Sequence, residues 1–302
     1  MKPKRILITG ATGLVGMRIV DAAISRGWIT TTTARSDLKQ QGFHHTHIKS
    51  DITSTSWCDD VHESIEECDV IIHAAANIDL KASTGELWKS NVGGTMNALR
   101  LVKRWGTRQI VFISTLGMFS AYEGTVKEDR VIAPQGSYYK SKFRSEQILM
   151  TANNLGIAGN VAILRISAPI GRGMPRHRML SNFIEQAVSN STIRVMEANR
   201  HQDYIDTRDI ARAVALTAEN NASGYCNICS GKSYSNKEVA YACIKATGSR
   251  SQVEIQDDSP GNDACILTRS NFCNKKAEIE LGFKATLGLS DTIKDISSQD
   301  CS

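Results

Sequence analysis

A glycine-rich turn between an apolar run and a helix is the feature that most constrains how this chain folds. Ile6-Leu7-Ile8 indicates a buried strand, and the turn Thr9-Gly10-Ala11-Thr12-Gly13-Leu14-Val15-Gly16 follows it and opens a helix expected over Leu14–Ser25. In this order the first glycine allows the tight turn, the second lets the backbone approach a phosphate, and the third lets helix and strand pack closely. The free N–H groups and the positive end of the helix dipole then face an anion. The pattern predicts the pyrophosphate turn of a dinucleotide site.

A tyrosine and a lysine four residues apart form a second constellation. Tyr138 and Lys142 share one face of a helix expected over Tyr138–Asn153. A tyrosine with a pKa near ~10 is a poor base at neutral pH, and a neighbouring ammonium lowers that pKa by stabilising the phenolate. Such a pair moves a proton to or from a hydroxyl or carbonyl while a nicotinamide moves the hydride. The alternative is a solvated helix face.

Strand-like and helix-like segments alternate along the first half of the chain. We expect strands at Lys4–Thr9, Ile29–Ala34, Asp69–Ala74, Gln109–Ser114 and Asn160–Ile166, and helices at Arg18–Arg26, Leu87–Trp105 and Tyr138–Asn153. This alternation predicts an α/β fold with a doubly wound parallel sheet. After Pro169 the pattern becomes irregular, with a glycine-rich loop at 171–175 and a helix-like segment at Ser181–Ser189.

Taken together, these features resemble the extended short-chain dehydrogenase/reductase superfamily, and within it the NAD-dependent epimerase/dehydratase family. The motifs that carry the resemblance are the turn 9–16, Asp51-Ile52, His73-Ala74-Ala75-Ala76, Asn91-Val92-Gly93-Gly94-Thr95, Ile113-Ser114-Thr115, Leu164-Arg165 with Pro169 and Gly171, Asp203-Tyr204-Ile205 with Asp209-Ile210-Ala211, Tyr225-Cys226-Asn227-Ile228 with Gly231, and Glu280-Leu281-Gly282-Phe283. They cover most of the chain in the family's order.

The resemblance implies a Rossmann domain with a smaller C-terminal substrate-binding subdomain. We expect the NAD(P)-binding domain at 1–166, with the chain returning to it at about 203–222, and the subdomain at 167–202 and 223–302. A small-molecule substrate and a homodimer are the expected partners, since many relatives dimerise through a four-helix bundle.

The resemblance also places individual residues. The catalytic ones are Tyr138 as general acid/base, Lys142 on the nicotinamide ribose, and Thr115, with Ser114 as the alternative, on the reacting oxygen. The expected cofactor contacts are Gly10, Thr12, Gly13, Leu14, Val15, Gly16, Arg35, Ser36, Asp51, Ile52, Ala74, Ala75, Ala76, Asn91, Tyr138 and Lys142.

Cofactor preference depends on the end of the second strand. NAD-preferring relatives usually place an acid there on the ribose 2′-hydroxyl, and this chain has Ala34 followed by Arg35. A guanidinium suits the 2′-phosphate of NADP, so NADP(H) is favoured. NAD(H) stays open, because Arg35 facing solvent or Asp37 reaching the ribose would allow it.

The residues after Thr115 narrow the chemistry. Leu116 and Gly117 stand where dehydratases and decarboxylases of the family carry acids. We therefore expect an NADPH-dependent reductase of a keto group on a sugar nucleotide or another small carbonyl compound. The alternatives are a nucleotide-sugar epimerase with tightly bound NAD and a non-catalytic dinucleotide sensor.

The sequence constrains the identity of the substrate less than that of the cofactor. Galactose-type epimerases bind the substrate diphosphate through an Asn and an Arg whose positions here are Ala168 and Gln202. The candidate replacements among the arginines are Arg172, Arg176, Arg178 and Arg200.

Composition excludes several other classes. The net charge of +5 over 302 residues is too mild for a nucleic-acid binder, and no run reaches the length of a membrane span. Eight scattered cysteines and a first strand at the very start predict a cytoplasmic protein with reduced thiols. Cys226 and Cys229 are expected as buried thiols, and the histidines His44, His45 and His47 as a loop rather than a metal site.

Overall fold

The computed structural model describes residues 3–38, 42, 44–119, 124–131, 133–256 and 270–298, and its centre is a seven-stranded parallel sheet. The strand order is β11-β7-β5-β4-β1-β2-β3. The strands are β1 (Arg5–Thr9), β2 (Ile29–Ala34), β3 (His45–Lys49), β4 (Val70–His73), β5 (Gln109–Thr115), β7 (Asn160–Ile166) and β11 (Gly224–Ile228). The predicted doubly wound α/β fold is confirmed.

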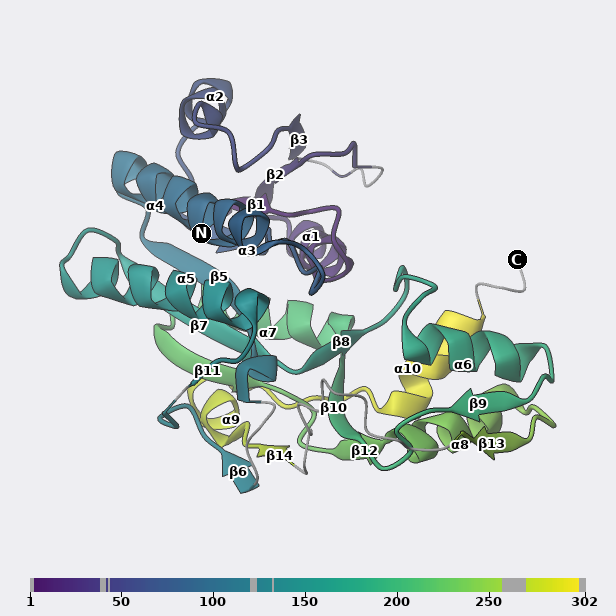
Figure 1. Cartoon of the computed structure of the whole chain (residues 1–302). Helices are drawn as coiled ribbons and strands as arrows, with labels where there is room; N and C mark the ends of the chain where they lie inside the picture. The colour runs from purple at the N-terminus through teal and green to yellow at the C-terminus, as the bar shows by residue number, and fades with distance from the viewer. Residues whose placement is uncertain are drawn as a thin grey trace.

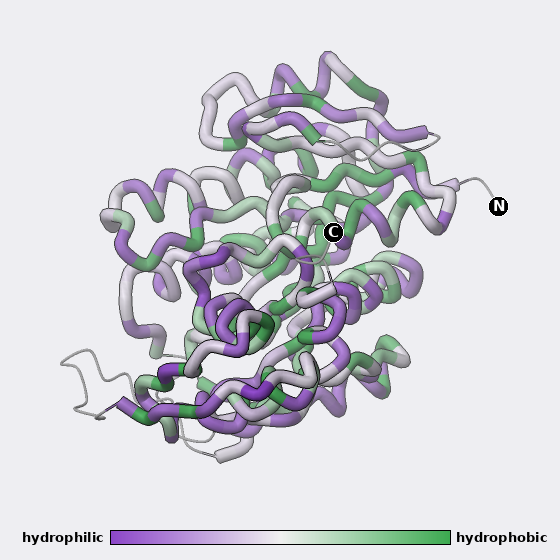
Figure 2. The backbone as a smooth tube through the Cα atoms, turned by 90° about the vertical axis from the view of Figure 1, so that its right-hand side faces the viewer, coloured by the Kyte–Doolittle hydropathy of each residue, from purple (hydrophilic) through white to green (hydrophobic). Residues whose placement is uncertain are grey.

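Apolar side chains on both faces explain why the strands are central. Ile6 and Ile8 face one layer of helices and Leu7 faces the other, since successive side chains of a strand point to opposite faces. The first layer contains α1 (Leu14–Ser25) and α7 (Thr207–Glu219); the second contains α2 (Trp57–Ser64), α4 (Gly94–Trp105) and α5 (Ser137–Asn154). Figure 2 shows hydrophobic segments running through the middle of the molecule.

The chain reverses its winding between β1 and β4. β1 pairs with β2 on one side and with β4 on the other, so the sheet grows in both directions from β1. Ligands of open α/β sheets bind beyond the carboxyl ends of the strands at such a switch point. The glycine-rich turn lies there, because it directly follows β1.

The edge strand β3 corrects one expectation. His45 and His47 lie in this strand rather than in a loop, and only His44, with φ of 63°, precedes it. Both rings reach the hydroxyl of Thr32 on β2, with Nε2 of His45 at 3.0 Å and Nδ1 of His47 at 2.9 Å. Among the described residues no group of three or more potential metal ligands occurs.

A second lobe is built from smaller elements. Its core lies between α6 (Met179–Val188), α8 (Asn236–Thr247) and α10 (Leu289–Ser297), with the short sheets β12-β10-β8 and β13-β9 beside it. These strands are β8 (Ala168–Ile170), β9 (Ile193–Val195), β10 (His201–Asp206), β12 (Ser233–Ser235) and β13 (Val253–Ile255). Figure 1 shows α6, α8 and α10 together at the end of the molecule away from α2 and α4.

The remaining elements lie around these two parts. They are α3 (Thr84–Leu87), the π-helix η1 (Trp88–Gly93), the 3-10 helix η2 (Leu116–Phe119), β6 (Gly124–Val126), β14 (Ser270–Phe272) and α9 (Lys275–Leu281).

β11 pairs with β7 in the large sheet, although we expected residues from 223 onward in the subdomain. The exact domain boundaries stay a prediction.

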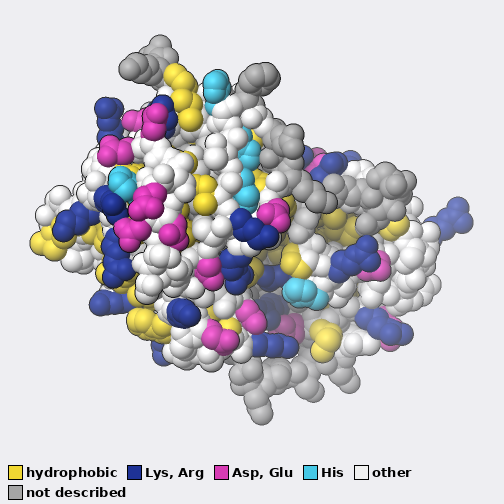
Figure 3. Space-filling model, turned by 90° about the horizontal axis from the view of Figure 1, so that it is seen from above, with side chains coloured by type: hydrophobic (Ala, Val, Ile, Leu, Met, Phe, Trp, Pro, Cys, Tyr) yellow, Lys and Arg dark blue, Asp and Glu magenta, His cyan; other side chains and the backbone are white. Residues whose placement is uncertain are grey.

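The surface and the thiols complete the description. Basic and acidic side chains are intermingled over the face seen in Figure 3, so the positive charge is not gathered into one patch there. Cys226 and Cys229 are buried free thiols, as predicted. In the described part of the chain, no helix combines the length and the apolar character that a membrane crossing needs.

Candidate active site

The glycine-rich turn forms a backbone cradle at the carboxyl end of β1. Gly10 has φ of +71°, and a Cβ there would lie 2.6 Å from the backbone N and Cα of Ala75. A Cβ on Gly16 would lie 2.1 Å from the carbonyl oxygen of Gly10. α1 starts at Leu14, and its N-cap residue Gly13 offers no side-chain cap, which leaves the first N–H groups of the helix for a ligand. The residues present therefore fit a dinucleotide pyrophosphate.

The predicted adenosine contacts lie along the same edge of the sheet. Ser36 follows β2 and donates its hydroxyl to Oγ1 of Thr12 at 3.1 Å. Asp51 follows β3 and accepts the N–H of Thr53 at 2.9 Å, while the carbonyl of Ile52 accepts from Asn97 at 2.7 Å. Ala74, Ala75 and Ala76 follow β4. The parallel strands thus bring together loops that are far apart in the sequence.

Behind the turn, His73 joins three elements. Its Nδ1 lies 2.8 Å from the hydroxyl of Thr9 on β1, and its Nε2 lies 3.1 Å from that of Thr95 on α4. Burial, with a smaller contribution from the Lys142 charge, lowers the pKa of His73 to about 3, so the ring is neutral at physiological pH. In the sequence, His73 stands out only as part of a family motif, and its place at the end of an apolar strand is the signal that points to this role.

Asn91 connects the loop after β4 to the helix that carries the catalytic pair. Its amide Nδ2 donates to the carbonyl of Asn77 at 3.0 Å and to the hydroxyl of Ser141 at 2.9 Å, and its Oδ1 accepts the N–H of Asn77 at 2.7 Å. Ser141 in turn donates to the carbonyl of Tyr138 at 2.7 Å. Asn91 lies in the π-helix η1, a departure from α-helical geometry that is frequent at functional sites. Its side chain orders the site, and its cofactor contact stays a prediction.

The expected catalytic residues come from β5 and α5. Thr115 ends β5, and its hydroxyl accepts the N–H of Gly117 at 3.0 Å. The hydroxyl of Ser114 is buried without a hydrogen-bond partner in the described part of the chain. Tyr138 and Lys142 lie in the first turns of α5. The packing of α5 against β5 thus brings Lys142 to the end of this strand, where it reaches the carbonyl of Ile113, and the closer grouping of the catalytic residues stays a prediction.

Lys142 differs from the expectation in one respect. Its ammonium donates to the carbonyl of Ile113 at 2.7 Å and lies 3.9 Å from the ring centre of Phe112, rather than binding the Tyr138 hydroxyl. Burial lowers the pKa of Lys142 to about 7, which Glu146 partly offsets. Burial raises the pKa of Tyr138, with a further rise from Tyr139 and an opposing effect of Arg178. The expected lowering of the pKa of Tyr138 by Lys142 is therefore absent in the free protein, because the ammonium is engaged by β5.

Tyr139 fills the space beside Gly117. The Tyr138 and Tyr139 rings meet edge to face with centres 5.2 Å apart, and Tyr139 packs on the small core of Leu116 and Phe119. A Cβ on Gly117 would lie 2.6 Å from Cε1 of Tyr139, closer than side chains approach in proteins. Residue 117 is where relatives that eliminate a group carry an acid, and such a side chain would fit here only if the Tyr139 ring moved.

The four arginines considered as ligands of a substrate diphosphate differ in their ion pairs and in their distance from the site. Arg172 pairs with Asp295 at 2.8 Å and Arg200 pairs with Glu197 at 2.8 Å, so both are engaged. Arg178 immediately precedes α6, and its charge acts on Tyr138. Arg176 is exposed. Among the four, Arg178 is the one whose charge reaches the proposed catalytic tyrosine.

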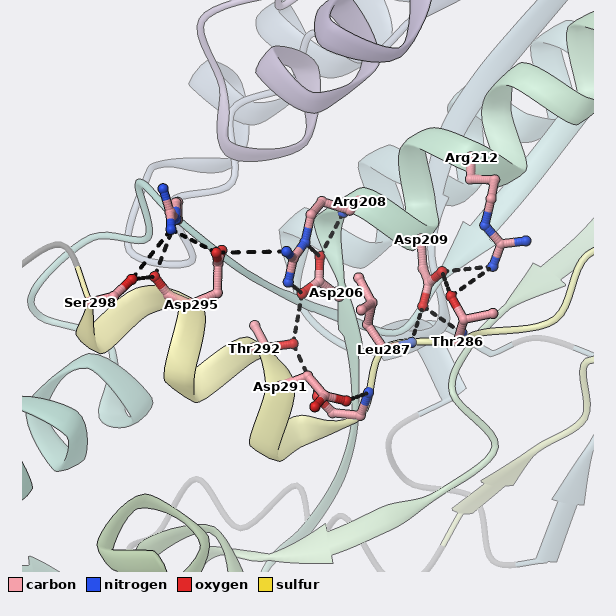
Figure 4. A network of polar contacts seen from close by, with 12 residues as sticks. Asp206, Arg208, Asp209, Arg212, Thr286, Leu287, Asp291, Thr292, Asp295 and Ser298 are labelled. Carbon is pink, nitrogen blue, oxygen red and sulfur yellow. Dashed lines mark hydrogen bonds and ion pairs between the residues drawn. The ribbon is translucent and has the colours of Figure 1, made fainter. Parts of the chain in front are cut away.

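α10 is tied to the start of α7 beside this region. Thr292 donates to Asp206 at 2.7 Å, and Asp206 also accepts from Arg208 at 2.8 Å; Asp295 pairs with Arg208 at 3.6 Å as well as with Arg172. Figure 4 shows Arg208 of α7 between the carboxylate of Asp206, at the end of β10, and that of Asp295 on α10. The network joins α10 to the end of β10 and the first turn of α7.

The fold and this site define a dinucleotide-dependent enzyme, and comparison with known proteins identifies its family. The model of the NAD dependent epimerase/dehydratase family matches residues 6–229, and the chain belongs to that family. The chain is 29% identical over 307 residues to a putative UDP-glucose 4-epimerase of Methanocaldococcus jannaschii, covering 96% of each chain. It is 25% identical to a putative dihydroflavonol 4-reductase of Synechocystis sp., covering 68% of this chain and 60% of that protein.

Solved structures share the fold over nearly the whole chain. The UDP-glucose 4-epimerase of Thermotoga maritima with UDP-glucose superposes with a TM-score of 0.86 at 19% identity, covering 98% of both chains. MoeE5 in complex with UDP-glucuronic acid and NAD gives a TM-score of 0.85 at 22% identity, covering 98% of this chain and 99% of that one.

Proposed function

We propose that the protein is an epimerase of a nucleoside-diphosphate sugar that oxidises one carbinol of the sugar and reduces it again from the other face. The observation that supports the proposal is that Lys142, four residues after Tyr138 on α5, bonds to β5 at Ile113, two residues before Thr115, while Tyr139 occupies the space beside Gly117. The putative UDP-glucose 4-epimerase of Methanocaldococcus jannaschii matches over 96% of both chains, which supports this choice over our first expectation of a reductase.

In this mechanism the protein handles the proton, and a dinucleotide held at the glycine-rich turn would supply hydride transfer from and back to the sugar carbon. Thr115 donates a hydrogen bond to the reacting oxygen. The Tyr138 phenolate takes the proton of the carbinol hydroxyl as the C–H bond breaks, and the resulting phenol returns it when the C–H bond forms again. Because burial raises the pKa of Tyr138 in the free protein, this step requires the Lys142 ammonium to leave the Ile113 carbonyl and stabilise the phenolate.

An NADPH-dependent reductase is the second candidate, and one observation favours it. β2 ends in Ala34 without a carboxylate, and the exposed Arg35 follows directly. A guanidinium at this point suits a 2′-phosphate. A cofactor that is kept reduced in cells would favour net reduction of a ketone.

Two assays distinguish the candidates. Purified protein is incubated with UDP-glucose or UDP-galactose without added cofactor, and the sugars are separated by chromatography. Interconversion supports the epimerase. Consumption of NADPH in proportion to a reduced product, without interconversion, overturns it in favour of the reductase, and formation of a dehydrated sugar overturns both.

A further inference from the structure

The adenosine end of the cofactor site has a lysine directly beside the end of β2. β2 and β3 are parallel, and their register places Lys49 opposite Ala34. The N–H of Ser50 donates to the carbonyl of Ala34 at 2.8 Å, which holds the two strand ends together. Ala34 occupies the position at which NAD-binding relatives carry their ribose-binding acid. The neighbouring strand therefore brings a cation to the place where a carboxylate is missing.

The loop after β2 is held to β3 by its backbone. Nε2 of His47 lies 3.1 Å from the carbonyl oxygen of Ser36 and donates to it, since a carbonyl can only accept. Nδ1 of the same ring lies 2.9 Å from the hydroxyl of Thr32. With the Ser36 hydroxyl bonded to Thr12, residues 35 and 36 are fixed between the glycine-rich turn and β3. This bracing orders the segment that carries Arg35 before any ligand binds.

The charged side chains around this loop include one more cation than carboxylates. Nζ of Lys49 pairs with Oδ2 of Asp37 at 3.0 Å, and both side chains are mostly exposed. Arg35 is exposed and has no hydrogen bond or ion pair with another described residue. The Asp37 carboxylate is thus occupied by Lys49, while Arg35 stands beside it with its charge unneutralised by the described residues.

We propose that Lys49 is the second cation of a 2′-phosphate site, in which it exchanges the carboxylate of Asp37 for the phosphomonoester of the cofactor and binds it together with Arg35. The inference rests on the proposed dinucleotide-dependent function and specifies the cofactor. A phosphomonoester with two negative charges matches the two cations better than the single carboxylate does. The site selects the phosphorylated dinucleotide because an unphosphorylated ribose offers nothing that replaces Asp37 on Lys49.

Affinity measurements without substrate test the proposal. Titration calorimetry gives the dissociation constants of NADPH and NADH, and of the fragments adenosine 2′,5′-bisphosphate and AMP, for each variant. Lys49→Gln should weaken the binding of NADPH by about three- to tenfold, because it removes a charge-assisted hydrogen bond that solvent exposure makes weaker than a buried one. The binding of NADH should stay unchanged or become tighter. Asp37→Asn should act in the opposite direction and tighten NADPH. Lys276→Gln, which removes a surface lysine paired with Glu280 at 3.8 Å on α9, should change neither constant.

The double variant separates direct binding from masking of Asp37. In the Asp37→Asn background, Lys49→Gln should still weaken NADPH and the bisphosphate relative to AMP. If it has no further effect, Lys49 merely neutralises Asp37 and the proposal is overturned. Equal loss for NADPH and NADH also overturns it.

The affinities of the wild-type protein for the two dinucleotides distinguish failure of the phosphate site from failure of the proposed dinucleotide-dependent function. Tighter binding of NADH than of NADPH overturns the phosphate site but leaves the dinucleotide-dependent enzyme standing. Absence of binding by either dinucleotide would instead overturn the proposed function itself.

Discussion

Arg165 and Glu146 form an ion pair inside the protein, with Nη2 and Oε2 2.8 Å apart and side chains that are 3% and 0% exposed. Arg165 lies on β7 and Glu146 on α5, so the pair fastens the helix of Tyr138 and Lys142 to the sheet. The guanidinium also donates to the carbonyl of Glu128 at 3.1 Å and lies 4.3 Å from the Tyr225 ring centre. These extra contacts meet the need of a buried guanidinium for more than one partner.

Removing one partner of this buried ion pair should destabilise the folded protein. Arg165→Met leaves the carboxylate of Glu146 buried and alone, and we expect the free energy of unfolding to fall by about 3–5 kcal/mol. Urea unfolding measures it, with Glu66→Gln, which breaks the exposed pair of Arg5 and Glu66 at 2.6 Å, as the control that should lose less than about 1 kcal/mol. The double variant Arg165→Met with Glu146→Leu should recover much of the loss. Equal losses for the buried and exposed single variants would contradict the prediction.

Removing the phenol should separate chemistry from binding. Tyr138→Phe deletes the proton carrier and keeps the ring, so turnover should fall at least about 100-fold while dinucleotide affinity persists. Steady-state rates and calorimetry measure the two effects. Tyr241→Phe, at an exposed tyrosine of α8, is the matched control. Near-normal turnover in Tyr138→Phe would rule out the mechanism and favour a non-catalytic sensor.

Cofactor binding should be linked to proton uptake. Burial lowers the pKa of Lys142 to about 7 in the free protein, so at pH about 8 the amine is mostly neutral. Hydroxyl oxygens of a bound ribose favour the ammonium and raise that pKa again, so binding takes up a proton. The measured heat of dinucleotide binding should therefore vary with the ionisation enthalpy of the buffer in the wild type and not in Lys142→Met. Heats independent of the buffer in both proteins would contradict this linkage.

His73 should make the protein sensitive to acid. Burial lowers the pKa of His73 to about 3 in the folded state, whereas an unfolded histidine has a pKa of about 6.5. Between these values only the unfolded chain binds the proton, so the free energy of unfolding falls by about 1.4 kcal/mol for each pH unit below 6.5. Urea unfolding between pH about 6.5 and 5 should give a smaller slope in His73→Asn than in the wild type. Parallel slopes would show that the ring is not the titrating group.

The strands that could be predicted are those buried on both faces. β1, β4, β5 and β7 are runs of apolar residues in which both alternating sets contact helices, and each lies within a residue of its expected bounds. β3 was missed because it is an edge strand with a polar sequence, HTHIK, whose partners are threonine hydroxyls rather than a core. Its formation depends on pairing with β2, which a local pattern does not contain.

The family was predictable because short segments of the chain carry its motifs. The glycine turn and the spacing of Tyr138 and Lys142 are local, and they gave the correct family. The bond from Lys142 to Ile113 and the pairing of Lys49 with Asp37 join different elements, and both depend on packing or strand register. The same holds for Tyr139, whose ring blocks residue 117 from a neighbouring helix.

The contact between Gly117 and Tyr139 restricts how this enzyme could evolve. An acid at position 117 would require its Cβ to occupy space that the Tyr139 ring already holds. A mutation to Glu there would first damage the packing, whereas shrinking Tyr139 first would open the space and weaken the small core beside Tyr138. A descendant with an acid at residue 117 must therefore also move or replace the Tyr139 ring, so the packing couples changes at these two positions.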